Sequence, residues 1–542
     1  MAETPAIADY LIQRLQEEGL RDVFGLPGDY VLGFLDHLAG SSLRMVGTCD
    51  EQGAGFAADA YGRLNGLGAL CVTYCVGGLK AVNAVAGAYA EKSPLVVISG
   101  SPGLEERRGS PLLHHKVKTF QTQFRVYREV TVAAAMLDDP ETAASEIDRC
   151  LHLCLRYKRP VYLEIPRDRV NTPIRSTAQT VRPEAASDPA ALEEAVNEAA
   201  QMLNNAKRPA ILAGVEVHRF GLQKTLEQLV SDSGYPVAAT ILGKSVIREN
   251  HERYLGVYEG AMGPEHTREA IESSDGLLIL GAFMSDLNLG VGTARLNRDT
   301  TINATSENIA IRHHHYEGLD FSEFMRQLAK RLSKRDDLSL PEAVQGERPA
   351  YQVEEKKPMT VRRFIRRLDD ENIVICDIGD SLFGGVDLKI HRQTEFLSPA
   401  YYTSMGFAVP AALGAQIAQP RLRPIVLVGD GAFQMTGQEL SSIVRYGLNP
   451  VIFVLNNEGY TTERFIHEGP YNDIHNWAYH RMPELLQAGW GCEVFTEGDL
   501  EQALSDAAKH TDSFAIINVH LDKMDHSMAL ERLGQRLSQH FQ

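Results

Sequence analysis

The chain has 542 residues, of which 44% are hydrophobic and 23% are charged, so it is long enough for about three globular domains. Its 54 Lys and Arg residues against 71 Asp and Glu residues give a formal net charge of −17. This acidic balance argues against nucleic acid or an anionic membrane as the main partner.

The cysteines and the N-terminal stretch indicate where the protein resides. Seven cysteines, sparse and odd in number, predict reduced thiols rather than a disulfide framework. The first residues contain neither a basic segment nor an apolar core, and no apolar run approaches the length of about 18 residues that spans a membrane. We therefore expect a cytoplasmic protein with no signal peptide and no membrane span.

Two polar stretches, at 177–189 and 333–358, divide the chain into three blocks in which short apolar runs alternate with helical patterns. Continuous apolar strands separated by helices indicate parallel sheets that are covered on both faces. We therefore predict an α/β protein of three doubly wound domains with mostly parallel sheets, at 1–178, 188–335 and 358–542. The predicted strands are, in chain order, 70–74, 94–100, 210–214, 276–283, 373–380, 424–430 and 451–457.

The strongest chemical signal lies in the third block, at the ends of two consecutive predicted strands. Gly429, Asp430 and Gly431 end one strand, and Asn456 and Asn457 end the next. The 24 residues at positions 432–455 fit one crossover helix, which the glycine at position 447 would end. Both motifs then lie at the carboxyl ends of neighbouring parallel strands, where ligands bind in open α/β sheets.

The residue types at these strand ends suit a metal-bridged diphosphate. Asp430 offers a carboxylate, Asn457 an amide oxygen and Gly459 a backbone carbonyl, and Mg²⁺ prefers oxygen ligands. Gly429 and Gly431 let backbone N–H groups come close to phosphate. Either motif alone is a common turn, but together, at this spacing, they predict a magnesium and diphosphate site.

This pair of motifs resembles the thiamine-diphosphate fingerprint, in which GDG is followed about 25 residues later by NN. The resemblance extends over the whole chain, in the order pyrimidine-binding, middle and diphosphate-binding domain. It implies thiamine diphosphate and Mg²⁺ as cofactors, with Asp430, Asn457 and Gly459 as metal ligands and with Met405 supporting the bent cofactor. The cofactor-binding positions implied by the resemblance are Gly28, Glu51, Thr73, Asp380, Ser381, Thr403, Met405, Gly429, Asp430, Gly431, Ala432, Asn457, Gly459 and Tyr460.

Further segments resemble the pyruvate, indolepyruvate and phenylpyruvate decarboxylases. CDEQGAGFAADAYGR places Glu51 at the position of the glutamate that exchanges a proton with the cofactor's pyrimidine ring. FGLPGDY supplies Asp29, LLHHKV supplies His114 and His115, and NNEGYTTERF supplies Glu463. The resemblance implies that these four side chains relay the proton that an aldehyde product needs, after CO₂ has left a small-molecule 2-keto acid.

Five positions that line the substrate space of relatives are Ile378, Leu382, Leu287, Thr462 and Ile466. At the first four, the residue differs from the one that pyruvate decarboxylases often have, and an aromatic is replaced by leucine at two of them. We therefore expect aryl, branched or longer-chain 2-keto acids to be preferred over pyruvate.

The resemblance also implies a homodimer at minimum and a homotetramer as the expected assembly, with Glu51 and Asp430 of one site on different subunits. Two alternatives stay open: a carboligase of the acetolactate synthase type, and a regulatory protein that binds thiamine diphosphate without turnover. The consecutive histidines at 313–315 are not expected to bind zinc, because alternate side chains of a strand point apart.

Overall fold

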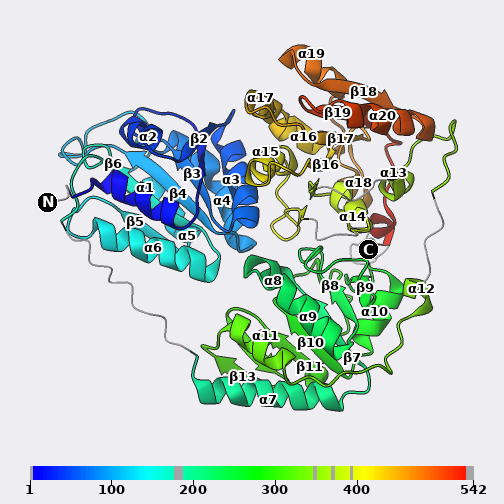
Figure 1. The fold of residues 1–542 in the computed structure, drawn as a ribbon. Coiled ribbons are helices and arrows are strands. Elements are labelled where there is room, and N and C mark those ends of the chain that lie inside the picture. Colours follow the sequence, from blue (N-terminus) through cyan, green and yellow to red (C-terminus); the bar gives the residue numbers. More distant parts are fainter. Residues whose placement is uncertain (1–3, 176–186, 346–350, 368–372, 391–394, 533–542) are drawn as a thin grey trace.

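The structure, a computed structural model, describes residues 4–175, 187–345, 351–367, 373–390 and 395–532. It contains three α/β domains, each built on its own sheet (Figure 1). Most of the first predicted linker, and positions 346–350 of the second, lie outside the described residues. Within the described part of the chain, no helix is both long and apolar enough to cross a membrane.

The first domain has an all-parallel sheet with helices on both faces. Its strands lie in the order β2 (Arg44–Gly47), β1 (Asp22–Gly25), β3 (Gly68–Val72), β4 (Leu95–Ser101), β6 (Val161–Pro166) and β5 (Ala133–Met136). Its helices are α1 (Ile7–Glu17), α2 (Leu32–Ala39), α3 (Glu51–Asn65), α4 (Val76–Ala90), α5 (Thr122–Glu129) and α6 (Ala143–Tyr157). Strands β1, β3, β4 and β6 are buried throughout, which explains their continuous apolar sequences.

The middle domain has a mixed sheet, because its last two strands run antiparallel. The strand order is β13 (His314–Glu317), β12 (Asn308–Ile311), β11 (Thr301–Ala304), β10 (Gly276–Leu280), β7 (Pro209–Ala213), β8 (Val237–Ala239) and β9 (Tyr254–Val257). The helices are α7 (Pro189–Asn205), α8 (Val215–Arg219), α9 (Gln223–Ser233), α10 (Glu265–Glu272) and α11 (Phe321–Ala329), with α12 (Glu342–Gln345) beyond them.

The third domain again has an all-parallel sheet. The strand order is β15 (Phe396–Leu397), β14 (Val374–Cys376), β16 (Ile425–Gly429), β17 (Val451–Asn456), β19 (Ala515–His520) and β18 (Trp490–Val494). The main helices are α13 (Val361–Arg367), α14 (Asp380–Val386), α15 (Ala408–Ala418), α16 (Asp430–Thr436), α17 (Leu440–Arg445), α18 (Thr461–Ile466), α19 (Met482–Leu486) and α20 (Glu497–Lys509).

The predicted fold class is confirmed, and every predicted strand overlaps a strand of the structure. One detail was wrong: the crossover between β16 and β17 is not a single helix but α16 and α17 joined by a 3₁₀ turn at Gly437–Glu439. Gly447 does follow the end of α17, with a φ of 64° that favours glycine. All seven cysteines are free thiols.

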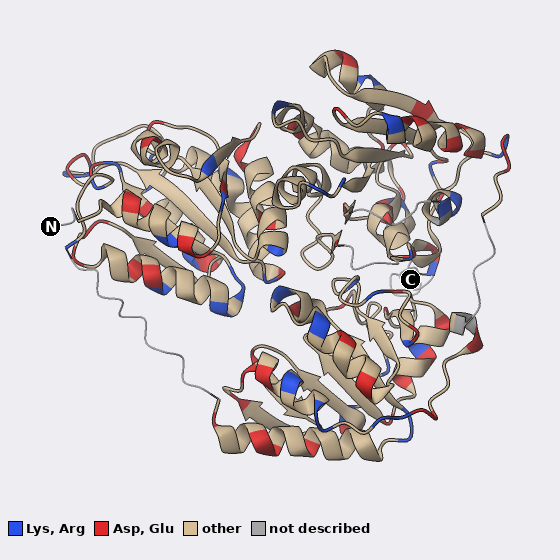
Figure 2. Cartoon of the chain, viewed as in Figure 1, with Lys and Arg blue, Asp and Glu red and all other residues tan. Residues whose placement is uncertain are grey.

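Figure 2 shows that charged residues lie mainly on the outer helices and loops, while the strands are largely uncharged. The first and third domains share one hydrophobic core, and α3 packs closely against α15. A Cβ atom on Gly414 would lie 1.9 Å from the carbonyl oxygen of Ala57, so only glycine permits this approach. The Glu439 carboxylate accepts N–H donors from Cys49 and Asp50, which fixes the start of α3 against the third domain.

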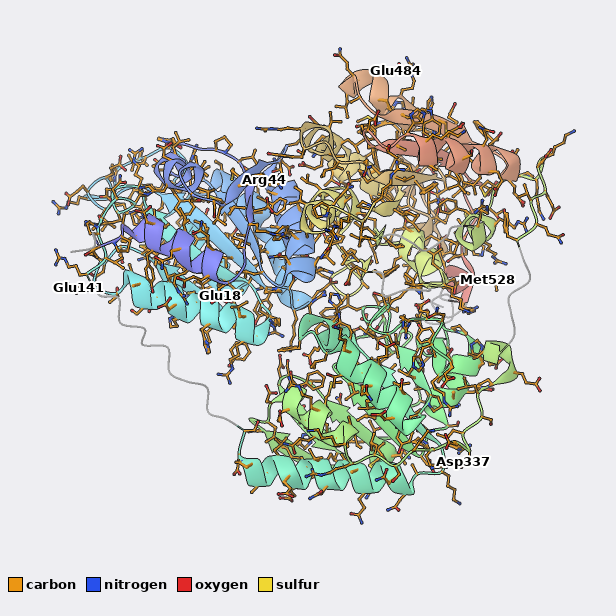
Figure 3. The ribbon with its side chains drawn as sticks, viewed as in Figure 1. Glu18, Arg44, Glu141, Asp337, Glu484 and Met528 are labelled. Carbon is orange, nitrogen blue, oxygen red and sulfur yellow. The ribbon has the colours of Figure 1, made fainter. Side chains whose placement is uncertain are left out.

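The end of the described chain returns to the junction of the middle and third domains. Met528, labelled in Figure 3, lies there beside the third domain, and the guanidinium of Arg532 donates to the carbonyl of Met262 at 2.7 Å. Ala529 and Leu530 join Met262 and Phe383 in a small buried apolar cluster. The C-terminal segment therefore contacts the helix α14 that lines the candidate site.

Candidate active site

Asp430 is the first residue of α16, directly after β16, and its side chain is buried. Its two carboxylate oxygens accept backbone N–H groups of Gly431 at 2.7 Å and Gly459 at 3.1 Å. Burial raises the pKa of the Asp430 carboxyl to about 6, although these N–H groups oppose the shift. A buried carboxylate with so little charge compensation is suited to a cation.

The loop after β17 brings Asn457 and Gly459 to the same place. Gly459 has a φ of 147°, and a Cβ atom there would lie 2.0 Å from the carbonyl oxygen of Asn472, so glycine is required. Arg464, from α18, is buried and donates to the carbonyl oxygens of Asn457 at 3.0 Å and Glu458 at 2.9 Å. Arg464 thus fixes the loop that carries the candidate ligands, a role the sequence reasoning missed.

A cavity of about 380 Å³ opens at these strand ends, between the third domain and the loop after β10 in the middle domain. This volume is within the range of small-molecule sites, roughly 300–1,000 Å³. Predicted site residues that line it are Ile378, Asp380, Ser381, Thr403, Met405, Gly429, Asp430, Gly431, Ala432, Asn457, Gly459, Tyr460, Thr462, Glu463, Ile466 and Leu287. The structure therefore brings together the members of the site predicted from the third block, with one exception.

The exception is Leu382, which we expected to line the substrate pocket. Its side chain is fully buried in the hydrophobic core of the third domain, and its neighbour Phe383 lines the cavity instead. The two residues are consecutive on α14, so their side chains point in directions about 100° apart. The prediction placed the cavity face of this helix one residue too early.

Asp377, which was not predicted as a site residue, fixes a turn of the cavity wall through hydrogen bonds. It is fully buried after β14, and its carboxylate accepts N–H groups of Gly406 at 3.0 Å and Ala408 at 2.8 Å. These bonds position the turn that carries Thr403 and Met405, in which Thr403 has a left-handed φ of 58°. Burial raises the pKa of the Asp377 carboxyl to about 6.

Asp380 is tied to the C-terminal segment, almost 150 residues away in the sequence. Its carboxylate accepts the backbone N–H of Ser527 at 2.8 Å and also the Ser527 hydroxyl. Burial raises the pKa of Asp380 to about 6, and the bonds from Ser527 oppose that shift. The docking of the C-terminal segment is thus coupled to a residue that lines the cavity.

The remaining predicted residues gather in the first domain, also at the carboxyl ends of strands. Glu51 begins α3, and its carboxylate lies 3.7 Å from the ammonium of Lys80. Thr73 follows β3, and its buried hydroxyl has no hydrogen-bond partner among the described residues. A Cβ atom on Gly28 would lie 2.4 Å from that of Thr73, so glycine allows the two loops to meet. Glu51 and Thr73 both lie against Gly77, and the unpartnered buried hydroxyl of Thr73 is a place where a ligand could bond.

Asp29, His114 and His115 form a cluster of their own in this domain. The Nε2 of His114 lies 2.6 Å from a carboxylate oxygen of Asp29, and the His114 ring stacks on Tyr30. The two histidine rings are 4.8 Å apart and nearly perpendicular. The structure thus brings Asp29 into a hydrogen bond with His114, 85 positions away in the sequence, and the ring of His115 packs beside that of His114.

The residues of the first domain and those around Asp430 do not meet in one cavity. Every residue that lines the cavity at Asp430 belongs to the middle or third domain, and none of the described residues of the first domain does. Within a single chain, the first domain contacts the third through α3 and α15 rather than through the cavity.

The class of protein follows from comparison with known families. Residues 6–126 match the N-terminal thiamine pyrophosphate (TPP) binding domain of thiamine pyrophosphate enzymes. Residues 196–332 match their central domain, and residues 377–519 match their C-terminal TPP binding domain. The chain thus has the domains of a thiamine-diphosphate enzyme, in the order that the sequence predicts.

Similar proteins narrow the class. The chain is 38% identical to the alpha-keto-acid decarboxylase of Mycobacterium avium (strain 104), over 96% of this chain and 94% of the relative. It is 36% identical to the indole-3-pyruvate decarboxylase of Azospirillum brasilense, over 98% of each chain. It is 34% identical to the pyruvate decarboxylase of Aspergillus fumigatus, over 97% of this chain and 95% of the relative. The chain belongs to the family of thiamine-diphosphate-dependent 2-keto acid decarboxylases.

Proposed function

We propose that this protein removes CO₂ from a 2-keto acid and releases an aldehyde, with thiamine diphosphate and Mg²⁺ as cofactors. The observation that carries the proposal is the buried Asp430 carboxylate at the carboxyl end of β16. It accepts the backbone N–H of Gly459, from the loop that also carries Asn457. The names of the relatives, which cover nearly the whole chain, support the same reaction.

Mg²⁺ would be held by Asp430, Asn457 and the carbonyl of Gly459. All three offer oxygen, the ligand type that Mg²⁺ prefers, and diphosphate oxygens would supply further ligands. The raised pKa of Asp430 supports this assignment, because a bound cation would compensate the buried charge. Arg464 keeps the loop in place by bonding the carbonyls on either side of the Asn457–Glu458 peptide.

Thiamine diphosphate supplies the electron sink that makes loss of CO₂ possible. The chain's own residues handle protons. Glu51, a partly buried carboxyl at the start of α3, would exchange a proton with the cofactor's pyrimidine ring. The short hydrogen bond between His114 and Asp29 provides a path along which a proton can move toward the product carbon. Glu463, on the cavity wall, would complete this relay.

We also propose that each active site is shared by two copies of the chain, so that a homodimer is the minimum and a homotetramer the expected assembly. The separation of the two half-sites supports this arrangement, because the residues around Glu51 and His114 do not line the cavity at Asp430. A two-fold axis that sets the first domain of one copy against the third domain of the other would complete two sites at once.

For the substrate, we propose a preference for aryl, branched or longer-chain 2-keto acids. The cavity wall around Ile378, Leu287 and Ile466 is apolar and contains leucine where an aromatic would fill more space. An apolar pocket discriminates by only about 1–3 kcal/mol per methylene, so the preference should be graded. The relatives' names include both indole-3-pyruvate decarboxylase and pyruvate decarboxylase.

The direct test is to assay a panel of 2-keto acids for aldehyde and CO₂. A 2-hydroxy ketone as the main product would instead indicate a carboligase, and cofactor binding without any product would indicate a regulatory protein. If pyruvate is the best substrate by tenfold or more, the proposed pocket preference is wrong.

The cofactor site has its own test. Asp430→Ala should lower the Mg²⁺-dependent affinity for thiamine diphosphate by at least roughly 10–100-fold. Loss of a residue that only supports a metal ligand already costs this much, and Asp430 is proposed as a ligand itself. Asp337→Ala, which removes an exposed carboxylate far from the cavity (Figure 3), is the matched control and should bind as the wild type does. Equal affinity in the two variants, measured by calorimetry, would show that the metal site lies elsewhere.

A further inference from the structure

Asp29, His114 and His115 resemble a metal site in their ligand types and spacing. Each offers one ligand atom, and these atoms all lie within 4.8 Å of one another. The geometry points to a site for Zn²⁺ at this cluster, distinct from the proposed magnesium site. Two imidazoles and one carboxylate are donors that zinc accepts readily, whereas Mg²⁺ prefers oxygen ligands alone.

The spacing needs only small movements to fit zinc. With metal–ligand distances of about 2.0–2.1 Å, two ligands of a tetrahedral Zn²⁺ lie about 3.3 Å apart. The His114–Asp29 pair, at 2.6 Å, would open slightly, and His115 would close toward it from within 4.8 Å. Three protein ligands leave a fourth position for water, as in the zinc sites of hydrolytic enzymes.

A second observation supports a ligand at this position. The Nδ1 of His115 is buried and has no hydrogen-bond partner among the described residues. Buried polar atoms of this kind are normally satisfied, so the unpartnered nitrogen of the His115 ring points to a missing partner. The other side of the cluster is open, since Asp29 and His114 keep 40% and 58% of their side-chain surface exposed.

The neighbouring charges do not oppose a cation. The basic group of Arg167 lies near the cluster, over the ring of Tyr30 at 5.1 Å, and His114 stacks on the same ring. Its charge is balanced by an ion pair with Glu106. The negative charge of Asp29 is therefore not cancelled by Arg167, and it favours a divalent cation at the cluster.

Zinc at this cluster would inhibit the enzyme. Binding occupies the imidazole lone pairs and displaces any proton they carry, so the histidines could no longer relay protons. This inhibitory consequence rests on the proposed function, whereas binding itself does not. The two are therefore measured separately.

Binding is tested on the protein saturated with thiamine diphosphate and Mg²⁺, titrated with Zn²⁺ in a calorimeter and with Co²⁺ in a spectrophotometer. One Zn²⁺ per chain is expected beyond the magnesium site, and Co²⁺ should give the strong visible absorption of a tetrahedral site. The double variant His114→Ala/His115→Ala should lose the absorption and at least tenfold of the affinity. Asp29→Asn provides a second, milder variant if the double variant does not fold.

The consecutive histidines at 313–315 provide the matched control. They are exposed at the edge of the middle domain and bond separately to Asp299, Glu198 and Arg298. Replacing all three with alanine should leave the Zn²⁺ affinity unchanged. The assignment is overturned if this control variant loses the site, if the Asp29 and His114/His115 variants retain it, or if the wild type takes up no additional ion.

Inhibition is read from aldehyde formation in the same Zn²⁺ range. Activity of the wild type and of the 313–315 control should fall as the site fills and return when a chelator removes zinc. Full activity with the site occupied would overturn the inhibitory role and leave the metal site standing. Failure of the proposed function is recognised independently, because the protein would then form no aldehyde even without zinc.

Discussion

Replacing Asp377 with asparagine should change the pH dependence of stability in a defined direction. The Asp377 carboxyl is fully buried, and its pKa is raised from 3.8 to about 6. The folded protein therefore holds this proton more tightly than the unfolded chain does. The stability that results is fully present below about pH 4 and is lost as the pH rises toward 6.

The magnitude follows from the size of the shift. A rise of about two pKa units costs about 3 kcal/mol once the group is ionised in both states. About 1.4 kcal/mol of this loss falls between pH 5 and pH 7.5. Asparagine has no such loss, but its amide can accept through only one oxygen. It therefore leaves the N–H of Gly406 or Ala408 poorly paired, at a pH-independent cost of about 1–3 kcal/mol.

Urea unfolding of the wild type and of Asp377→Asn, each at pH 5 and pH 7.5, isolates the effect. The free energy of unfolding of the variant, relative to the wild type, should improve by about 1.4 kcal/mol from the lower to the higher pH. Turnover should fall at both pH values, because the turn that carries Met405 is held less firmly. A stability difference that stays constant, or that moves the other way, would refute the burial argument.

Two further predictions concern the relay and the cavity wall. His114→Ala, His115→Ala and Glu463→Gln should each lower turnover by roughly 10²–10⁴-fold and leave the cofactor affinity unchanged. Stopped-flow rates measure the turnover, and calorimetry measures the affinity. Weakened cofactor binding would indicate a structural role instead. Phe383→Ala should enlarge the cavity and raise kcat/KM for bulkier 2-keto acids relative to pyruvate. Leu382→Ala should instead cost about 2–5 kcal/mol of stability and leave the ratio of the kcat/KM values unchanged. If Leu382→Ala changes this ratio and Phe383→Ala does not, Leu382 lines the pocket and Phe383 does not.

The sequence predicts the parts of this protein that depend on local patterns. Apolar runs such as 424–430 and 451–457 are strands because a parallel sheet buries both faces, so no alternation interrupts them. The position of Asp430 at a strand end then follows from the chain order alone. Asn457 and Gly459 come to the same edge because consecutive parallel strands start from the same side.

The features that the sequence did not reveal depend on contacts across the fold. Leu382 and Phe383 are both apolar, and only the direction in which α14 leaves Gly379, whose φ is 87°, decides which of them faces the cavity. In the sequence, Asp377 is only an acidic residue at the end of a strand. The backbone N–H groups of Gly406 and Ala408 that bond to it are brought there by the fold. The bond from Ser527 to Asp380 joins segments far apart in the chain, so no local pattern signals it.

The central claim is that two copies of the chain combine their half-sites into one decarboxylase site, and subunit mixing tests it most directly. Glu51→Gln and Asp430→Ala proteins, each inactive alone, are mixed in equal amounts under conditions in which mass spectrometry proves subunit exchange. Half of the dimers are then mixed, and one of their two sites has both native residues, so about one quarter of the wild-type rate of aldehyde formation should return. No recovery despite proven exchange would contradict the account, because both residues of each site would then come from one chain.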